Sequence, residues 1–285
     1  MKVTVGLPFY NNEKTLEIAI KSILNQTLLD WELILIDDGS ADNSLIIAKK
    51  MADTDERIQL ISDGQNKGLI YRLNQIIGIA QGNYIARMDA DDIMLPERLE
   101  KQHAIFIGNA KIDIVATAAF TIDENDNPIG IRDTDEIILK SKKDIFKKSL
   151  LIHPSILVKR GWYKSNQYDK EYIRAEDFEL WCRTFSHTTF YRITEPLLLY
   201  REGNVSIKNY TSSMKTLRMI YKKHSKGILS DVELERAVFK THLKSLIYQF
   251  LGLFSLQYLL TSNRNNSLNS EQINYIKSTI LKLKN

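Results

Sequence analysis

Three aspartates stand at the end of a short apolar run: Asp89, Asp91 and Asp92 follow residues 84–88. The run comes after a Gly-Asn turn and is predicted to form a β-strand. Alternate side chains of an extended chain share a face, so Asp89 and Asp91 are expected on one side and Asp92 on the other. Two carboxylates so close repel each other, and a hard cation such as Mg²⁺ or Mn²⁺ removes that conflict by taking oxygen ligands. The spacing therefore predicts a divalent metal site.

The same aspartates have a simpler interpretation as a solvated acidic turn. In that case Asp92 would cap a helix that the sequence predicts to begin near Pro96. The order of the surrounding elements decides between the two interpretations.

The first 90 residues alternate between predicted strands and predicted helices. The strands are expected at residues 3–8, 31–36, 58–62 and 84–88, and the helices at 13–26, 43–52 and 69–80. Strands and helices of this length predict a parallel sheet with helices on both faces. Ligands of such sheets bind at the carboxyl ends of the strands. Polar clusters at 8–11, 37–38 and 89–92 all fall there, so they predict one site.

The pattern is less regular after residue 92. Further strands are expected at 112–120, 155–158 and 197–200, with a polar connection at 123–135, a short helix at 175–183, basic amphipathic helices at 212–260 and a polar linker at 262–270. The helix at 175–183 has acidic residues in its first turn, which complement the helix dipole.

Composition limits the classes of protein that fit. The chain has 285 residues, 44% of them hydrophobic, which is enough for a sizeable core. A single cysteine, Cys182, excludes an internal disulfide framework and favours a reducing compartment, so we expect a cytoplasmic protein. We expect no signal peptide, because Met1 and Lys2 lead directly into a strand, and no run of about 18 apolar residues spans a bilayer.

Charge is distributed unevenly along the chain. Residues 206–285 carry 13 Lys and Arg against 4 Asp and Glu, whereas residues 1–205 carry 26 against 31. Such a split marks a basic interaction surface, and an anionic membrane or nucleic acid would fit it. We expect no nucleic-acid partner, because the sequence has no zinc-finger spacing, no RNP-type motif and no basic run interleaved with aromatic residues.

Several ordered motifs resemble the family 2 glycosyltransferases with the GT-A fold. They are Val5-Gly-Leu-Pro-Phe-Tyr-Asn11, Ser22-Ile-Leu-Asn-Gln-Thr27, Asp37-Asp-Gly-Ser40, Asn66-Lys-Gly-Leu69 with Asn74, Asp89-Ala-Asp-Asp92, His153-Pro-Ser155, and Glu176-Asp177 with Leu180-Trp181. The resemblance covers residues 3–206, about 70% of the chain. It implies an α/β GT-A fold: a Rossmann-like, mainly parallel central sheet flanked by helices, followed by a C-terminal helical extension.

The resemblance also implies a division of the chain and an activity. We expect a catalytic domain at 1–205, with a nucleotide-sugar half at about 1–110 and an acceptor half at about 111–205, and a basic helical extension at 206–285. The implied reaction moves a sugar from a nucleotide diphosphate, with UDP favoured, to a glycan. The Q-x-x-R-W motif and transmembrane helices of processive family members are not found in the sequence, which implies single addition.

The resemblance assigns residues to the donor site. Asp38 would accept from a uracil N–H, Tyr10 would stack on the base, and Asp91 would bind the metal. Asp89 would be a second metal ligand or a ribose contact. The remaining donor-site residues implied are Pro8, Asn66, Lys67 and Arg72, where either cation would assist the diphosphate. Two simpler readings stay open: Asp38 as a turn residue and Arg72 on a solvated helix face.

The acceptor hydroxyl needs a base, because its pKa lies far above 7. Asp177 is the predicted base, and a direct displacement would invert the anomeric centre. Glu176, His153 and Trp181 are predicted to line the acceptor pocket. His153 is also a rival base, since its ordinary pKa is near 6.5, and a structural role is equally open. A tryptophan in such a helix is more often a core residue than a platform for a sugar, which is the simpler interpretation of Trp181. For Glu176 and Asp177, the simpler interpretation is that they complement the helix dipole.

Two questions stay open at this level. The basic extension could lie on an anionic membrane, pack on the catalytic domain or join a second subunit, and a lipid-linked acceptor at the inner membrane is implied by the resemblance alone. A sugar-nucleotidyltransferase or a non-catalytic carbohydrate-binding protein are the alternative classes. The first would need a glycine-rich basic loop after the first strand, where only Gly6 stands.

Overall fold

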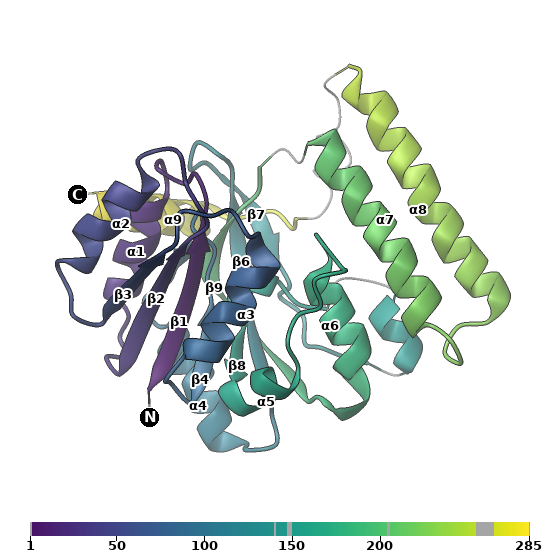
Figure 1. Cartoon of the computed structure of the whole chain (residues 1–285), viewed down its shortest axis with the longest axis horizontal. Helices are drawn as coiled ribbons and strands as arrows, with labels where there is room; N and C mark the ends of the chain where they lie inside the picture. The colour runs from purple at the N-terminus through teal and green to yellow at the C-terminus, as the bar shows by residue number, and fades with distance from the viewer. Residues whose placement is uncertain (1, 140, 147–149, 204–205, 255–264, 285) are drawn as a thin grey trace.

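The computed structural model describes residues 2–139, 141–146, 150–203, 206–254 and 265–284. A curled sheet forms the centre, helices cover both of its faces, and a pair of helices stands to one side (Figure 1). The order of strands in the sheet is β3-β2-β1-β4-β8-β6-β9-β5, with β7 paired to β6. This is the mostly parallel α/β sheet that the sequence predicts.

The parallel part of the sheet comes from the first 87 residues. Its strands are β3 (Ile58–Ser62), β2 (Trp31–Asp37), β1 (Val3–Phe9) and β4 (Tyr84–Arg87). β1 and β2 pair in parallel from Val3 opposite Trp31 to Phe9 opposite Asp37. Every residue of these two strands is buried, because helices cover both faces, and this explains their continuous apolar sequence.

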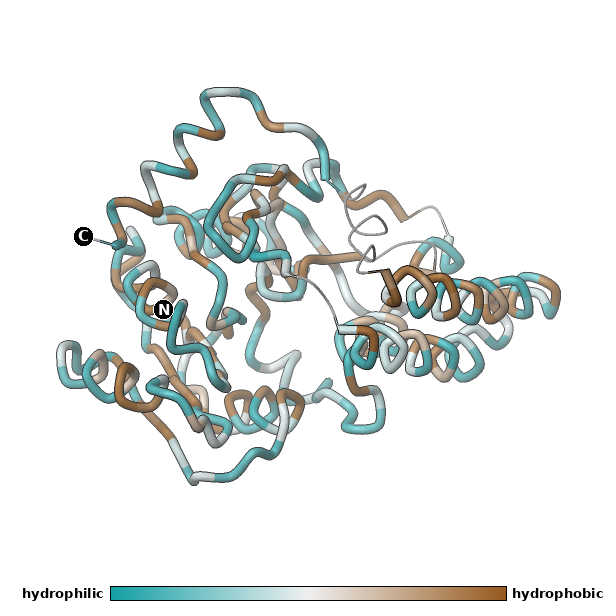
Figure 2. Tube along the Cα trace, turned by 90° about the horizontal axis from the view of Figure 1, so that it is seen from above, coloured by the Kyte–Doolittle hydropathy of each residue, from teal (hydrophilic) through white to brown (hydrophobic). Residues whose placement is uncertain are grey.

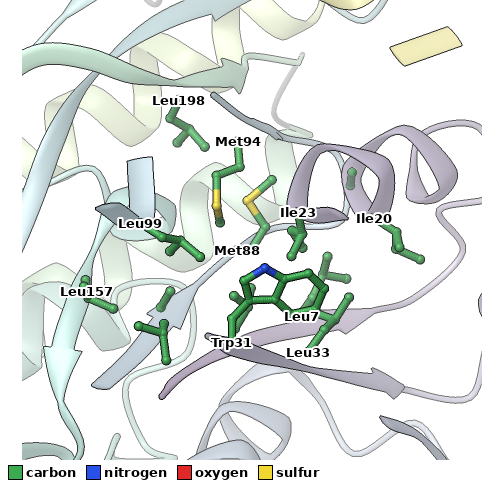
Figure 3. Close-up of a cluster of buried hydrophobic side chains, with 14 of the residues drawn as sticks. Leu7, Ile20, Ile23, Trp31, Leu33, Met88, Met94, Leu99, Leu157 and Leu198 are labelled. Carbon is green, nitrogen blue, oxygen red and sulfur yellow. The ribbon is translucent and has the colours of Figure 1, made fainter. Parts of the chain in front are cut away.

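Alternate residues of the parallel strands enter two different cores. On one face, Leu7 and Leu33 pack with Ile20 of α1 (Leu16–Leu24), in a cluster that also includes Met51 of α2 (Ser44–Ala52) (Figure 3). On the other face, Ile34 packs in a cluster with residues of α3 (Leu69–Ile79). The period-2 pattern of the strands and the amphipathic faces of the helices therefore fix the position of each strand end, where the polar clusters lie.

The second part of the sheet is mixed. Its strands are β5 (Ile93–Met94), β6 (Ile114–Ile122), β7 (Pro128–Arg132), β8 (Leu157–Lys159) and β9 (Phe190–Arg201). β8 is antiparallel to both β4 and β6, whereas β6 and β9 are parallel. β7 lies within residues 123–135, which the sequence predicts as a polar connection only. Its single buried pair, Gly130 and Ile131, carries too little apolar signal to be recognised.

The remaining helices connect and cover these strands. They are α4 (Arg98–Gly108), α5 (Arg160–Ser165), α6 (Glu176–Thr184) and the 3₁₀ helices Lys142–Phe146, His153–Ser155 and Phe185–His187. α6 matches the helix predicted at 175–183. α4 begins at Arg98, and its N-cap residue is Glu97, so Asp92 does not cap it.

The C-terminal region forms three helices with two different contacts. α7 (Ile207–His224) and α8 (Asp231–Gly252) pack against each other, and α7 also contacts α6. α9 (Ser270–Lys284) instead returns to α1, and its Ile276 and Ile280 join a core cluster with Ile93 and Leu199 (Figure 1). The predicted boundary at residue 205 stays a prediction, and α9 shares a core with the residues before it.

The helices predicted at 212–260 are two, separated at Ser225–Ser230, and residues 255–260 lie outside the described part of the chain, as do residues 262–264 of the predicted linker. Hydrophobic and hydrophilic residues alternate along α7 and α8 (Figure 2). Among the described residues, no helix combines the length and the apolar character needed to cross a membrane.

Candidate active site

A cavity of about 340 Å³ lies at the carboxyl ends of the parallel strands. It brings together seven of the residues predicted for the donor site: Pro8, Tyr10, Asp38, Asn66, Arg72, Asp89 and Asp91. They come from the ends of β1, β2 and β4 and from the segment that begins α3. Polar clusters that are distant in sequence therefore lie together at one cavity, and the roles of their residues stay predictions.

Asp38 is held by three donors from the segment before and in α3. Its carboxylate accepts from the backbone N–H of Lys67 at 2.8 Å and of Gly68 at 3.0 Å, and from Arg72 Nε at 2.8 Å. Asp38 is only 6% exposed, so these bonds fix its orientation. Its Oδ2 accepts only from Gly68 within the described residues, which leaves that oxygen able to accept another hydrogen bond at the cavity.

Gly39 makes this approach possible. Its φ of +77° lies in the left-handed region, and a Cβ built on it would meet the carbonyl carbon of Gln65 at 2.8 Å. Any other residue would therefore push the two loops apart. The Asp-Asp-Gly-Ser motif is thus explained by packing as well as by turn chemistry.

Arg72 forms an ion pair with Asp38, and its side chain is buried. It is fully buried, and its Nη2 contacts Asp63 Oδ1 at 2.6 Å. The pKa of Asp63 is held well below its ordinary value by the hydrogen bond from Arg72 and then by the one from Lys67. The predicted contact of Arg72 with a diphosphate stays a prediction. The solvated-face alternative is wrong, because the side chain is buried in this ion-pair network.

Lys67 lies at the boundary between two cavities. Its N–H bonds to Asp38, whereas its Nζ pairs with Asp63 at 2.7 Å, and the residue lines a second, larger cavity beside the first. The structure therefore does not place the Lys67 ammonium with the other donor residues.

Asp89, Asp91 and Asp92 form one acidic cluster. One carboxylate oxygen of each lies within 4.8 Å of the others, which is a spacing that would hold a metal ion. The expectation that Asp92 faces the opposite side is wrong, because β4 ends at Arg87 and the aspartates follow a turn in which the backbone N–H of Asp92 bonds to the carbonyl of Asp89. The alternation of an extended strand no longer applies there.

Electrostatics show the conflict within this cluster. Burial, followed by the charge of Asp89, raises the pKa of Asp91 to about 6. Burial and the charges of Asp91 and Asp89 raise the pKa of Asp92 well above its ordinary value. Asp92 Oδ2 is also buried with no partner among the described residues. Three oxygen ligands that repel one another and an unpaired buried oxygen fit a divalent cation.

Arg87 is a site residue that sequence reasoning missed. It is 5% exposed, its Nη2 pairs with Asp89 Oδ1 at 2.6 Å, and its Nε and Nη1 have no partner among the described residues. Burial opposes its charge, but nearby carboxylates, Asp89 first and then Asp92 and Glu176, raise its pKa above the ordinary value. The available signal was an arginine inside a buried apolar strand, because such a charge needs a partner.

Arg201, at the end of β9, was missed as well. Its backbone N–H bonds to Asp92 Oδ1 at 2.8 Å, and its Nε bonds to the carbonyl of Asp91 at 2.9 Å. Its Nη2 pairs with Asp126 at 2.6 Å. Arg201 therefore fixes the acidic turn from a strand more than 100 residues later, which no local pattern could predict.

The two acids at the start of α6 have different surroundings. Glu176 is 6% exposed, its Oε2 has no partner among the described residues, and burial, then the charge of Asp177, raises its pKa to about 7. Asp177 is half-buried, and burial also raises its pKa. Glu176 lines the larger cavity of about 920 Å³, whereas Asp177 lines neither of the two cavities.

His153 and Trp181 lie in an aromatic cluster. His153 Nε2 lies 2.6 Å from the hydroxyl of Tyr168, and its ring meets Trp181 edge-on at 6.3 Å. Burial, followed by the charge of Arg87, lowers the pKa of His153 well below its ordinary value, so the imidazole is neutral near pH 7. Trp181 is 1% exposed and belongs to the core, as its simpler interpretation predicts.

Comparisons with known proteins identify relatives of the chain. The family model described as "Glycosyl transferase family 2" matches residues 4–191. A curated relative, the O-antigen biosynthesis glycosyltransferase WbnJ of Escherichia coli, is 30% identical over 240 residues, which cover 78% of this chain and 90% of the relative.

Solved structures share the fold at low identity. TarS 1–349 of S. aureus in complex with UDP superposes with a TM-score of 0.62 at 18% identity, over 99% of this chain and 81% of that one. The mannosyltransferase PcManGT of Pyrobaculum calidifontis, in complex with GDP-Man and Mn²⁺, has a TM-score of 0.59 at 14% identity, over 99% of this chain and 85% of that one. These similarities show the GT-A fold.

Proposed function

This chain belongs to glycosyl transferase family 2, and we propose that it is an inverting, non-processive enzyme that moves a sugar from a UDP-linked donor to a lipid-linked glycan. Membership makes it a glycosyltransferase, which argues against the nucleotidyltransferase and the non-catalytic alternatives. Of the nucleotide sugars, a UDP donor is favoured by the TarS complex with UDP, although PcManGT was solved with GDP-Man.

One observation carries the donor assignment. Asp38 and the pair Asp89 and Asp91 line one cavity from neighbouring strand ends, with the half-exposed ring of Tyr10 on the same wall. Asp38 Oδ2 offers an acceptor for a nucleobase N–H, and Tyr10 offers a face for stacking. The carboxylates of Asp89 and Asp91 line the same cavity, and a metal that they held would contact the diphosphate of the donor.

The acidic cluster supports a divalent cation, Mn²⁺ or Mg²⁺. Asp91 and Asp89 would hold it, with Asp92 close enough to contribute an oxygen. When bound, such a cation would neutralise charge on the departing nucleotide diphosphate. The residues themselves provide the oxygen ligands, and Arg87 and Arg201 hold those ligands in place.

Asp177 is proposed to accept the proton of the attacking hydroxyl while the bond between the sugar and the diphosphate breaks. A single displacement with one base inverts the anomeric centre. Glu176 lies beside it at the wall of the larger cavity and would bind the acceptor. His153 is the weaker candidate base, because its Nε2 is already engaged with Tyr168.

The C-terminal helices support a location at an anionic membrane surface. The buried residues of α8 are Thr241 and Tyr248, so its opposite face points away from α7. That face carries Phe239, Leu246 and Phe250, each more than 60% exposed. Basic residues of α8 lie beside these apolar side chains, and the two together would contact an anionic membrane interface.

Self-association through this face is less favourable. From residue 236 to 252, α8 has three cations, Arg236, Lys240 and Lys244, and no acidic residue. The three acidic residues of α8, Asp231, Glu233 and Glu235, lie at its start, so α8 as a whole is balanced in charge. Parallel association would bring the cationic segments 236–252 of two copies together, whereas an anionic lipid surface attracts that segment. We therefore propose that the enzyme acts peripherally on the cytoplasmic face of the inner membrane, on a lipid-linked acceptor.

A thermal-shift panel tests the proposed activity. UDP- and GDP-linked sugars are added to the protein with Mn²⁺ or with EDTA. A ligand that binds only the folded state adds about 2.7 kcal/mol at 100-fold excess over its Kd. We expect a UDP-sugar to raise Tm only with Mn²⁺, and the stabilising sugar is then used to detect UDP release. No stabilisation by any nucleotide sugar with Mn²⁺ would contradict the proposal.

A further inference from the structure

The larger cavity has a composition unlike that of the donor cavity. Its volume is about 920 Å³, and it shares Gly68 and Leu69 with the donor cavity, so the two adjoin. Apolar side chains line much of it and stay open to solvent: Leu69 is 39% exposed, Tyr71 49% and Ile173 59%. An open apolar surface of this kind could contact an apolar part of a ligand.

Two cations stand on the same wall. Lys170 and Arg174 line the cavity, are exposed, and make no side-chain hydrogen bond or ion pair with another residue in the described part of the chain. The third cation of the lining, Lys67, is held by Asp63 at 2.7 Å. The only acidic residue of the lining is Glu176, so the cavity carries an excess of positive charge.

The segment that carries these cations is fixed at both ends. Asn74 of α3 bonds to the N–H and to the carbonyl of Tyr168, at 3.0 Å and 2.8 Å. At the other end, Thr216 Oγ1 of α7 donates to the carbonyl of Ile173 at 2.8 Å. Arg174 itself has a φ of +69°, a conformation that needs support from its surroundings. Lys170 and Arg174 therefore lie on a segment whose position is fixed by hydrogen bonds to α3 and α7.

Among the described residues, the cation that lines the donor cavity is Arg72, and it is bound to Asp38 and Asp63. Arg87 does not line this cavity, and its Nη2 is paired with Asp89. A diphosphate of the donor would therefore rely on the acidic cluster and its metal, whereas Lys170 and Arg174 stand in the adjoining cavity with their donors available. Guanidinium and ammonium groups are the usual partners of phosphate oxygens.

From these observations we infer that Lys170 and Arg174 bind the phosphate groups of the acceptor, and that Leu69, Tyr71 and Ile173 contact its adjoining lipid. The inference rests on the proposed function and narrows it: the acceptor is recognised through a phosphate attached to an apolar chain, not through its sugar alone. It also gives the enzyme a way to reject free oligosaccharides, which lack that charge.

The test uses undecyl diphosphate as the probe. Its binding is measured by calorimetry, below its critical micelle concentration, on the full chain saturated with UDP and Mn²⁺ so that the donor site is filled. Undecyl glucoside, which is neutral, and undecyl glucuronide, which carries a carboxylate, serve as comparison ligands. The variants are Lys170→Gln with Arg174→Gln, and a control pair of exposed lysines, Lys50→Gln with Lys164→Gln, which line neither cavity.

We expect undecyl diphosphate to bind the wild type and the control, and to bind the Lys170 and Arg174 double variant at least about tenfold more weakly, since about 1.4 kcal/mol of lost contact is tenfold in Kd. Affinity for UDP should be equal in all three proteins. Arg174→Lys, which keeps the charge, should retain most of the binding.

Four results would overturn the inference. The first is that the wild type does not bind undecyl diphosphate, and the second is that the double variant and the control bind it equally. The third is that the wild type binds undecyl glucuronide as tightly as undecyl diphosphate. The fourth is a loss of UDP affinity in the double variant, which would assign Lys170 and Arg174 to the donor site. Failure of the proposed function is seen separately, because the wild type would then not bind UDP with Mn²⁺.

Discussion

Glu176 should make the stability of the protein depend on pH in a direction set by its burial. Its pKa rises from 4.5 to about 7 because of burial and the charge of Asp177. The folded state therefore binds a proton more tightly than the unfolded state. The stabilisation from this group is fully present below pH 4.5 and is lost as pH rises through about 7.

The size of the effect follows from that change in pKa. Each pH unit is worth about 1.4 kcal/mol, so the rise corresponds to up to about 3 kcal/mol of unfolding free energy. Glu176→Gln keeps the shape and cannot ionise. Part of this change lies below pH 5, so relative to the wild type the variant should gain about 2.5 kcal/mol between pH 5 and pH 8.

Urea denaturation at pH 5 and pH 8 in EDTA measures this difference. EDTA removes metal from the acidic cluster, and the other buried carboxylates are present in both proteins, so they affect the difference less. Glu56→Gln, at an exposed glutamate, is the matched control and should show little change. If the advantage of Glu176→Gln over the wild type is the same at both pH values, or smaller at pH 8, the account of Glu176 is wrong.

Three further predictions concern the base, the donor loop and the membrane face. Asp177→Asn should bind UDP normally but lose roughly 10²–10⁴-fold in turnover, and His153→Asn should lose less; the reverse order in steady-state assays would make His153 the base. Gly39→Ala should lower Tm more than Gly64→Ala does, because both residues have positive φ but only Gly39 meets a neighbouring backbone; equal losses would contradict this. Sedimentation with anionic vesicles should fall with added salt and with Leu246→Asp; equal recovery with neutral vesicles would favour an oligomeric or purely structural role for the face.

The elements that position the site are largely predictable from the sequence. β1 and β2 are continuous apolar runs because both of their faces are buried, and their ends are marked by Pro8 and by Asp37. Because parallel strands place their carboxyl ends at one edge, Asp38 and Asp91 could be assigned to one cavity before the structure was known. Local patterns sufficed where periodicity and topology determine position.

The remaining features depend on contacts between distant residues. The burial of Arg72 follows from Asp63, and the orientation of Asp92 follows from Arg201, which lies on β9. Arg87 is a charged residue in an otherwise apolar, buried strand, and its ion pair with Asp89 explains why it is tolerated there. Sequence periodicity carries no information on such pairs, so the electrostatic balance of the site required the structure.

The acidic cluster and Asp38 are proposed to form a metal-dependent site for a nucleotide diphosphate. Calorimetric titration of UDP into the wild type and into Asp91→Ala, each with Mn²⁺ and with EDTA, measures this dependence. We expect tight binding only for the wild type with Mn²⁺, and loss of that binding both in EDTA and in Asp91→Ala. Undiminished affinity of Asp91→Ala for UDP in the presence of EDTA would contradict this proposal.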